Sequence, residues 1–106
     1  MIDVINKGNC EQFGLNKDAF EDFWYQLDKE ETLEGGTKLF HFDRVDENIN
    51  YGGGIFAFEK EEKCIFLDIY EFYGKFVFKD VLVFYGHEEV VVVHIPTLEI
   101  HKEYTR

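Results

Sequence analysis

Apolar residues recur along the chain with two different periods, and the period changes at Gly35 and Gly36. Before these glycines, apolar residues stand three or four positions apart, which is the spacing of one face of an α-helix. The residues of this stripe are Phe20, Phe23, Trp24 and Leu27. Asn16 is a suitable N-cap, and Asp18 supplies negative charge in the first turn. The pattern therefore predicts one N-terminal helix with an apolar inner face.

After Gly36, apolar and polar residues alternate with a period of two, which is typical of β-strands. Strands are expected at residues 37–43, 55–59, 64–73, 76–85, 90–95 and 98–104. Short turns between consecutive strands imply an antiparallel meander. The sequence thus predicts a single α+β domain over residues 1–106, in which the N-terminal helix packs on a curved antiparallel sheet of about five to six strands.

The central strands are expected to be apolar on both faces. In the strand predicted at 76–85, one face would carry Phe76, Phe78, Asp80, Leu82 and Phe84. One helix covers only part of one sheet face, so the other face needs sheet curvature, a terminal segment or a partner to shield it. An obligate homo-oligomer that uses this second face is therefore one alternative.

Composition adds a strong negative charge to this picture. The chain has 22 acidic and 11 basic residues, which gives a formal net charge of −11 at pH 7. Aromatic residues make up 18% of the chain, which favours a folded core over a disordered acidic segment. Residues 1–62 hold fifteen of the acids against six bases. This charge opposes binding to nucleic acid, because the phosphates carry the same sign.

The compartment is predicted from what the chain lacks. No basic segment followed by a long apolar one stands near Met1, and no apolar run approaches the roughly 20 residues of a membrane helix. The two cysteines, Cys10 and Cys64, are expected to be free thiols. We therefore expect a cytoplasmic protein with no membrane partner.

No motif predicts catalysis, a cofactor or a metal. Residues 52–54 are three glycines, but strand-like residues follow them where a phosphate-binding loop needs a helix N-terminus. The histidines lack the close spacing of zinc ligands, so His41 and His94 are expected to be hydrogen-bonded sheet residues. The chain contains no serine that could serve as a nucleophile. We therefore expect that the protein is not an enzyme.

Two aspartates fall on otherwise apolar strand faces, Asp68 in alternation with Tyr70 and Asp80 in alternation with Phe78. Burying a carboxylate without a partner is costly, and neighbouring acids raise each other's pKa. Asp68, Tyr70 and Asp80 either belong to a small acidic pocket walled by aromatic side chains, or lie on faces that are more exposed than the pattern indicates.

The outer face of the predicted helix is the best candidate for a binding surface. With the apolar stripe turned inward, a rotation of about 100° per residue turns Asp18, Glu21, Asp22 and Tyr25 outward. A tyrosine among carboxylates is the composition expected of a hot spot against an Arg/Lys-rich surface. Acids that could extend this patch are Glu30, Glu31, Glu34, Asp43, Asp46 and Glu47. The alternative is ordinary solvation of a charged helix face.

In size, charge and expected α+β make-up, the chain resembles bacterial immunity proteins, which block nuclease toxins, and phage-encoded inhibitors of nucleic-acid enzymes. The resemblance concerns overall character only, and no residue is carried over from it. It implies a small inhibitor that covers a basic partner with carboxylates in a 1:1 complex. The alternatives are a small-ligand-binding or enzymatic domain with an aromatic cavity around Asp68 or Asp80, and the homo-oligomer described above.

Overall fold

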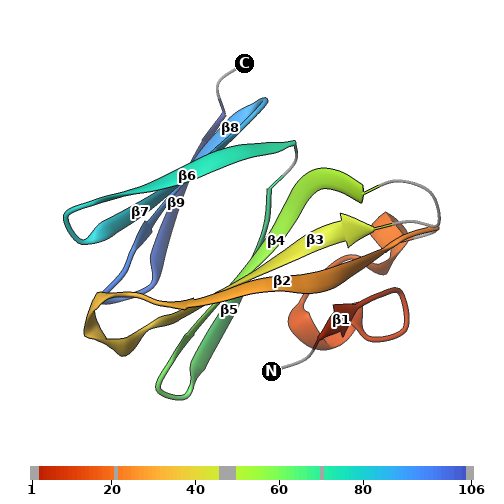
Figure 1. Cartoon of the computed structure of the whole chain (residues 1–106), viewed down its shortest axis with the longest axis horizontal. Coiled ribbons are helices and arrows are strands. Elements are labelled where there is room, and N and C mark those ends of the chain that lie inside the picture. Colours follow the sequence, from red (N-terminus) through yellow and green to blue (C-terminus); the bar gives the residue numbers. More distant parts are fainter. Residues whose placement is uncertain (1–2, 21, 46–49, 70, 105–106) are drawn as a thin grey trace.

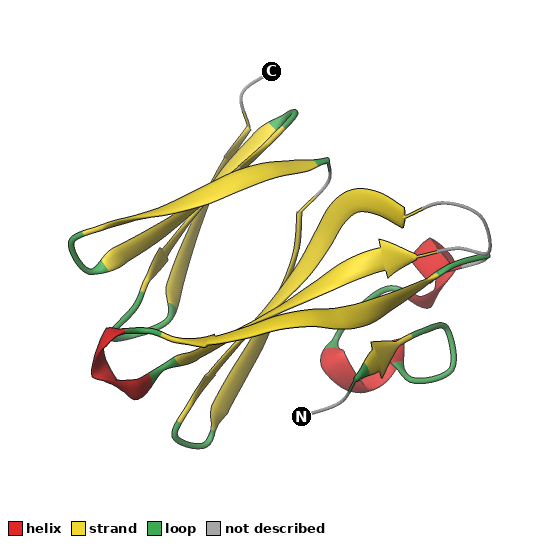
Figure 2. Ribbon diagram, in the orientation of Figure 1, coloured by secondary structure: helices red, strands yellow, loops and turns green. Residues whose placement is uncertain are grey.

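The computed structural model describes residues 3–20, 22–45, 50–69 and 71–104, without the side chains of Ala19 and of residues 50–53. Within these ranges the chain is almost entirely β-structure, arranged as two antiparallel sheets (Figure 1, Figure 2). Its helical structure consists of 3-10 turns of three or four residues. No described helix is long and apolar enough to cross a membrane.

Both sheets follow the order of the chain, and every neighbouring pair of strands is antiparallel. The five-stranded sheet contains β1 (Val4–Ile5), β2 (Trp24–Thr32), β3 (Lys38–Val45), β4 (Asn50–Lys60) and β5 (Lys63–Ile69). The four-stranded sheet contains β6 (Phe72–Phe78), β7 (Val81–Gly86), β8 (Glu89–His94) and β9 (Glu99–Tyr104). The 3-10 turns are η1 (Cys10–Phe13), η2 (Lys17–Phe20) and η3 (Glu34–Gly36).

The predicted N-terminal helix is wrong, and with it the α+β fold class. Among the described residues of this region only the single turn η2 is helical, and from Trp24 the chain forms strand β2, which pairs with β1 and with β3. Phe23, Tyr25 and Leu27 also alternate with a period of two, and they pack beneath the five-stranded sheet. Backbone pairing on both sides and burial of this alternate set outweigh the helical spacing.

Two apolar cores hold the molecule together, one on each face of the five-stranded sheet. The first lies between the two sheets, where the rings of Phe56 and Phe84 meet with their centroids 4.5 Å apart. The second lies under the opposite face, where the N-terminal segment buries Ile5, Cys10 and Phe20 against Phe42 of β3. The five-stranded sheet is therefore covered on both faces, whereas the four-stranded sheet is covered on one.

Two of the predicted strands, at residues 64–73 and 76–85, each run across a turn. The error at 76–85 changes which residues are buried. β6 ends at Phe78, and Lys79 adopts the left-handed backbone conformation with φ 56° before β7 begins. Because the chain reverses here, Phe76 pairs with Val83 and Phe78 with Val81, so both phenylalanines lie on the face opposite to Phe84. Phe76 and Phe78 are 53% and 61% exposed, whereas Phe84 is fully buried.

This arrangement predicts different losses of stability for truncation of Phe84 and of Phe76, which alternation along one continuous strand would place on the same face. Phe84→Ala is expected to lower the free energy of unfolding by about 3–5 kcal/mol, because it leaves a cavity between the sheets. Phe76→Ala is expected to lower it by about 1 kcal/mol or less, since its ring stands in solvent. Urea unfolding followed by circular dichroism measures both, and equal losses would contradict the turn at Lys79.

Candidate functional site

The outer face of the four-stranded sheet combines exposed aromatic side chains with a row of valines. The register places Phe76 of β6 beside Val83 of β7, and Val83 beside Val92 of β8. We use the name exposed sheet face for the apolar residues on this side, which are Phe76, Phe78, Val81, Val83, Tyr85, Val90 and Val92. Three adjacent strands thus present one continuous apolar surface away from the core.

Three aromatic side chains of the exposed sheet face stand in solvent. Phe76 and Phe78 are more than half exposed, and Tyr85 is 41% exposed. The ring centroids of Phe76 and Tyr85 lie 6.3 Å apart, so these side chains form one group. Burying a side chain of this size is worth about 1.5–3 kcal/mol. A contiguous surface of aromatic and valine side chains is typical of a contact site for another protein.

Gly74 fixes the position of Tyr85 on this face. A Cβ atom at Gly74 would lie only 2.5 Å from the Tyr85 hydroxyl and 2.8 Å from the adjoining ring carbon. The tyrosine therefore lies over the backbone of β6 at a position where no side chain is in the way. Packing of the ring on Gly74 also compensates for the glycine's lack of a side chain in the strand. The aromatic group is built into the sheet rather than carried on a loop.

The border of the exposed sheet face is mainly acidic. Asp80 lies in the β6–β7 turn, and Glu99 and Glu103 lie on the outer side of β9. Lys79 adds a cation, whose Nζ lies 5.5 Å from the ring centroid of Phe78. His101 Nε2 approaches the carboxylate of Glu103 at 2.8 Å. An apolar centre with a charged border is the usual anatomy of a protein interface.

Three polar side chains beside this border are hydrogen-bonded in series. Asp80 Oδ2 is 3.1 Å from Nε2 of His94, and Nδ1 of His94 is 2.7 Å from Oγ1 of Thr97. The order carboxylate, imidazole and hydroxyl is that of a hydrolase triad. Here, however, the Thr97 hydroxyl also accepts the backbone N–H of Glu99 at 3.3 Å, and all these contacts are exposed. The arrangement ties the β6–β7 turn to the β8–β9 turn.

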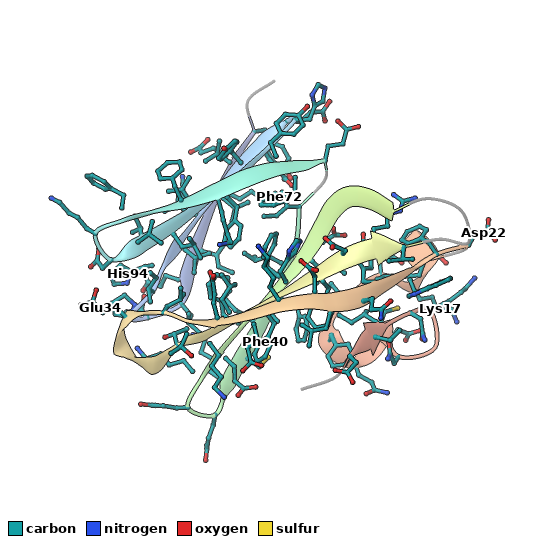
Figure 3. All side chains as sticks on the ribbon, viewed as in Figure 1. Lys17, Asp22, Glu34, Phe40, Phe72 and His94 are labelled. Carbon is teal, nitrogen blue, oxygen red and sulfur yellow. The ribbon has the colours of Figure 1, made fainter. Side chains whose placement is uncertain are left out.

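The acidic patch predicted on the helix is spread over several elements. Tyr25 is buried against Phe20 and Phe23, and burial raises its pKa to about 12. Asp18, Asp22, Glu30, Glu31 and Glu34 are exposed, Asp43 is half-buried, and Glu21, Asp46 and Glu47 lie outside the described residues. Figure 3 shows Asp22 and Glu34 at opposite ends of the molecule.

Lysines accompany two of these acids. Lys38 lies 3.7 Å from Glu30, and Lys75 of β6 lies 3.0 Å from Glu31 of β2, so the second pair joins the two sheets. The predicted patch therefore does not form one continuous carboxylate surface among the described residues.

Of the three residues predicted to share a pocket, the two that the structure describes, Asp68 and Asp80, are separated. Asp80 lies in the turn after β6, Asp68 lies on β5 of the other sheet, and Tyr70 is outside the described residues. Asp68 is exposed as a residue, but partial burial of its carboxyl group raises its pKa, and the Glu89 carboxylate adds to the effect. Lys102, which donates to the buried Glu89 at 2.9 Å, acts in the opposite direction on Asp68.

Among the residues that the structure describes, one group of side chains has metal-ligand chemistry, namely Asp28, His41 and Asp43, whose ligand atoms lie within 4.8 Å of one another. The two carboxylates approach different ring nitrogens of His41, at 3.7 Å from Nδ1 and 3.3 Å from Nε2. A metal ion binds one nitrogen lone pair, so the carboxylates do not converge on it. Lys29 and Lys75 line the same pocket of about 240 Å³ and oppose a cation.

The His41 imidazole instead supports the packing between the sheets. Its ring stacks on Phe56 with centroids 4.5 Å apart and planes 7° from parallel. Burial lowers the pKa of His41 and raises that of Asp43, which favours the neutral form of both groups.

No family model matches this chain, and no curated protein or solved structure is significantly similar to it. The surface of the molecule is therefore the source of the functional proposal below.

The sequence contained one signal for the exposed sheet face that the alternation pattern obscured. Lys79 and Asp80 are two consecutive charged residues inside an apolar run, and such a pair indicates a turn.

The pKa shift of Asp68 gives a pH-dependent prediction. A pKa raised in the folded state means that the ionised carboxylate destabilises the fold, and that this penalty disappears as the pH falls through the folded pKa towards the ordinary value of 3.8. Asp68→Asn is therefore expected to raise the free energy of unfolding modestly at pH 7. The gain should shrink on acidification, because the wild-type carboxyl then becomes neutral as well.

Urea titrations from pH 7 downward measure this difference. Glu62→Gln, in the exposed β4–β5 turn, is the matched control and is expected to change stability little at any pH. A lower stability of Asp68→Asn at pH 7 would show that the ionised carboxylate makes a favourable contact.

Proposed function

We propose that the protein acts by binding another protein through the exposed sheet face, and that this partner presents a basic surface. The observation that carries the proposal is the group of exposed aromatic side chains on a regular sheet, Phe76, Phe78 and Tyr85. Aromatic side chains dominate the energetics of protein interfaces, because they bring a large contact area at little cost in side-chain freedom.

Charge supports a basic partner. The border of the face carries Asp80, Glu99 and Glu103 against Lys79, and the chain as a whole has a net charge of −11. Such a field speeds encounter with a positive surface and orients it. Proteins that act on nucleic acids carry basic surfaces. We therefore favour a nuclease toxin, or another protein that acts on nucleic acid, as the partner that is neutralised in a 1:1 complex.

The proposed compartment is the cytoplasm. The structure has Cys10 buried and Cys64 exposed, and both are free thiols. Thiols remain reduced in the cytoplasm, where glutathione and thioredoxin act on them.

A second copy of the chain fits the exposed sheet face less well than a basic partner. In a two-fold dimer the same patch meets itself. The carboxylates of Glu99 and Glu103 from both copies would then border one interface, and the whole subunits would carry like charge. Like charges at an interface cost affinity, which disfavours the homo-oligomer.

The proposal is tested by affinity capture with the wild-type protein and with the double variant Phe76→Ser/Phe78→Ser, followed by reconstitution from purified proteins. The wild type is expected to hold a protein of high isoelectric point in a 1:1 ratio. The double variant should bind it at least about 100-fold more weakly, because two interface anchors are lost. Raising the salt concentration should weaken the wild-type complex, since the charges are then screened.

The control is Asp18→Asn/Asp22→Asn, which removes two negative charges without altering the exposed sheet face. It is expected to weaken binding by less than about threefold. Unchanged binding by the double variant contradicts the proposal. The proposal also fails if light scattering shows a wild-type dimer that the double variant converts to a monomer, because the face would then be occupied by a second copy.

A further inference from the structure

The five-stranded sheet has an open edge at β5, the last strand in its order. β5 pairs with β4 on one side, and among the described residues it makes no further backbone hydrogen bond to another segment. An edge strand presents unpaired N–H and C=O groups to its surroundings. The strand spans Lys63–Ile69, which is about 23 Å of edge at about 3.3 Å per residue. This edge is long enough to pair with another extended segment.

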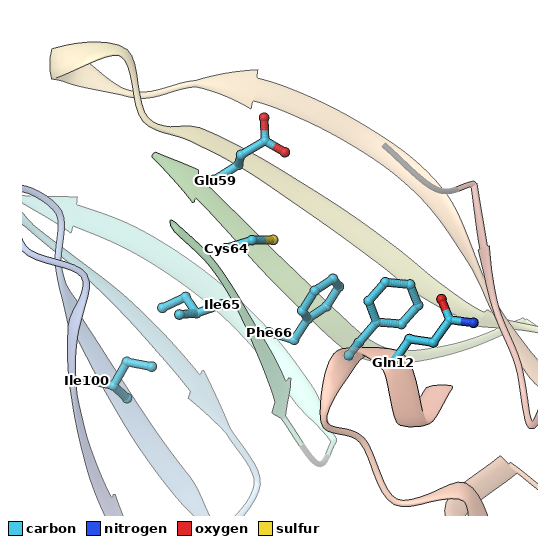
Figure 4. A pocket seen from close by; sticks show the side chains of 7 residues that line it. Gln12, Glu59, Cys64, Ile65, Phe66 and Ile100 are labelled. Atoms are coloured by element: carbon cyan, nitrogen blue, oxygen red, sulfur yellow. The ribbon is translucent and has the colours of Figure 1, made fainter. Parts of the chain in front are cut away.

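A cleft of about 630 Å³ lies at the first half of this edge, where Cys64, Ile65 and Phe66 line it from both faces of β5. Figure 4 shows Ile65 and Phe66 pointing to opposite sides of the strand, with Ile100 of β9 beyond Ile65 and Gln12 beyond Phe66. On the Phe66 side, the ring of Phe13 lies 4.8 Å away between centroids. The edge therefore has one apolar wall above it and another below it.

These two walls match the geometry of an extended peptide. Successive side chains of a strand point to opposite faces, so a peptide paired with β5 would place one side chain against Phe13 and Phe66 and the next against Ile65 and Ile100. Ile100 is 44% exposed and free to receive such a contact. Backbone hydrogen bonds supply affinity in strand addition, and the alternating pockets supply specificity.

The charge at the end of the cleft indicates a cationic residue in the peptide. The Glu59 carboxylate lines the cleft beside Cys64, and Glu61 and Glu62 follow in the turn. The two lysines of this hairpin are directed elsewhere, because Lys60 donates to the carbonyl of Pro96 and Lys63 to that of Thr97. Carboxylates without these lysine partners favour Lys or Arg in the ligand.

We propose that β5 is a second binding site, which accepts an extended, apolar and basic segment of a protein by strand addition at the open edge of the five-stranded sheet. This site is separate from the exposed sheet face, which belongs to the other sheet, and it does not depend on the function proposed there. Its ligand class is a peptide with adjacent apolar residues and a Lys or Arg that reaches Glu59.

The experiment uses acetylated and amidated heptapeptides of the pattern Lys-Thr-X-X-X-Thr-Lys, in which X is Val, Ile, Leu or Phe. Occupancy is measured on the intact protein as protection of Cys64 from a thiol reagent at pH 8.5, together with fluorescence anisotropy of labelled peptide. Cys64 is exposed and Cys10 is buried, so the reagent reports on the cleft. Saturating peptide is expected to slow the modification by about tenfold or more, because access to the thiol is lost.

Two peptide controls separate strand addition from other modes of binding. A peptide with N-methyl groups on alternate backbone nitrogens of the pairing edge keeps its side chains but loses its donors, and it is expected not to bind. A peptide with Glu in place of Lys is expected to bind more weakly. Equal binding of parent and N-methylated peptides overturns the proposal, because the cleft would then hold apolar groups without backbone pairing.

Two protein variants complete the design. Ile100→Asp changes an exposed cleft residue and is expected to weaken peptide binding by about tenfold or more, since it buries a charge against the apolar wall. Glu59→Gln should weaken binding by about two- to fivefold, as expected for an exposed ion pair. Phe76→Ser/Phe78→Ser should bind peptide like the wild type, which separates this site from the exposed sheet face.

Unfolding curves must show that Ile100→Asp remains folded. The proposal is overturned if no peptide of the set protects Cys64. It is also overturned if Cys64 becomes protected with rising protein concentration alone, because the β5 edge would then pair with a second copy of the chain.

Discussion

The packing of Phe56 on Phe84 is the contact on which the rest of the structure depends, because it fixes which face of the second sheet is inside. Side chains alternate strictly along a strand, so a shift of one residue would move every side chain of that strand to the opposite face. With Phe84 held against Phe56 at 4.5 Å between ring centroids, β7 turns Val81, Val83 and Tyr85 outward. The pairing of β6 with β7 then carries Phe76 and Phe78 to the same outer face.

This constraint also explains why the two sheets differ in what they leave accessible. The five-stranded sheet is buried on both faces, and its edge at β5 remains accessible. The four-stranded sheet is buried on one face, and what it leaves accessible is a surface of side chains. A face can bind a folded surface, whereas an edge can bind a segment of backbone. The fold therefore offers two chemically different kinds of contact.

The sequence predicts the strands better than it predicts their faces. Alternation located most of the residues of β3 to β9, because period-two patterns follow directly from strand geometry. The predicted single sheet of about five to six strands is wrong, since the described strands form two antiparallel sheets. Alternation failed at Lys79, where a charged pair inside an apolar run hid a turn, and the error placed Phe76 and Phe84 on one face. Near the N-terminus, Phe20, Phe23, Trp24 and Leu27 satisfied the helical period, but pairing with β1 and β3 decided the conformation. Such pairing depends on residues distant in sequence.

The candidate sites were harder to predict, because they depend on what remains uncovered after the sheets pack. Tyr25 was predicted as an exposed hot spot but is part of a core, whereas Tyr85, for which no role was predicted, lies on the surface. Composition gives the net negative charge of the chain but not its distribution over the surface. Glu31, for example, is paired with a lysine from the other sheet.

Gly74 has a consequence for how this protein can change during evolution. Its missing side chain is what allows Tyr85 to lie flat on the sheet, with the hydroxyl 2.5 Å from where a Cβ atom would be. A mutation to alanine would leave the strand order intact and would alter the shape of the outer surface. Selection on the proposed partner binding would thus act on a residue that has no side chain with which to touch the partner. The pair of positions 74 and 85 is expected to change together or not at all.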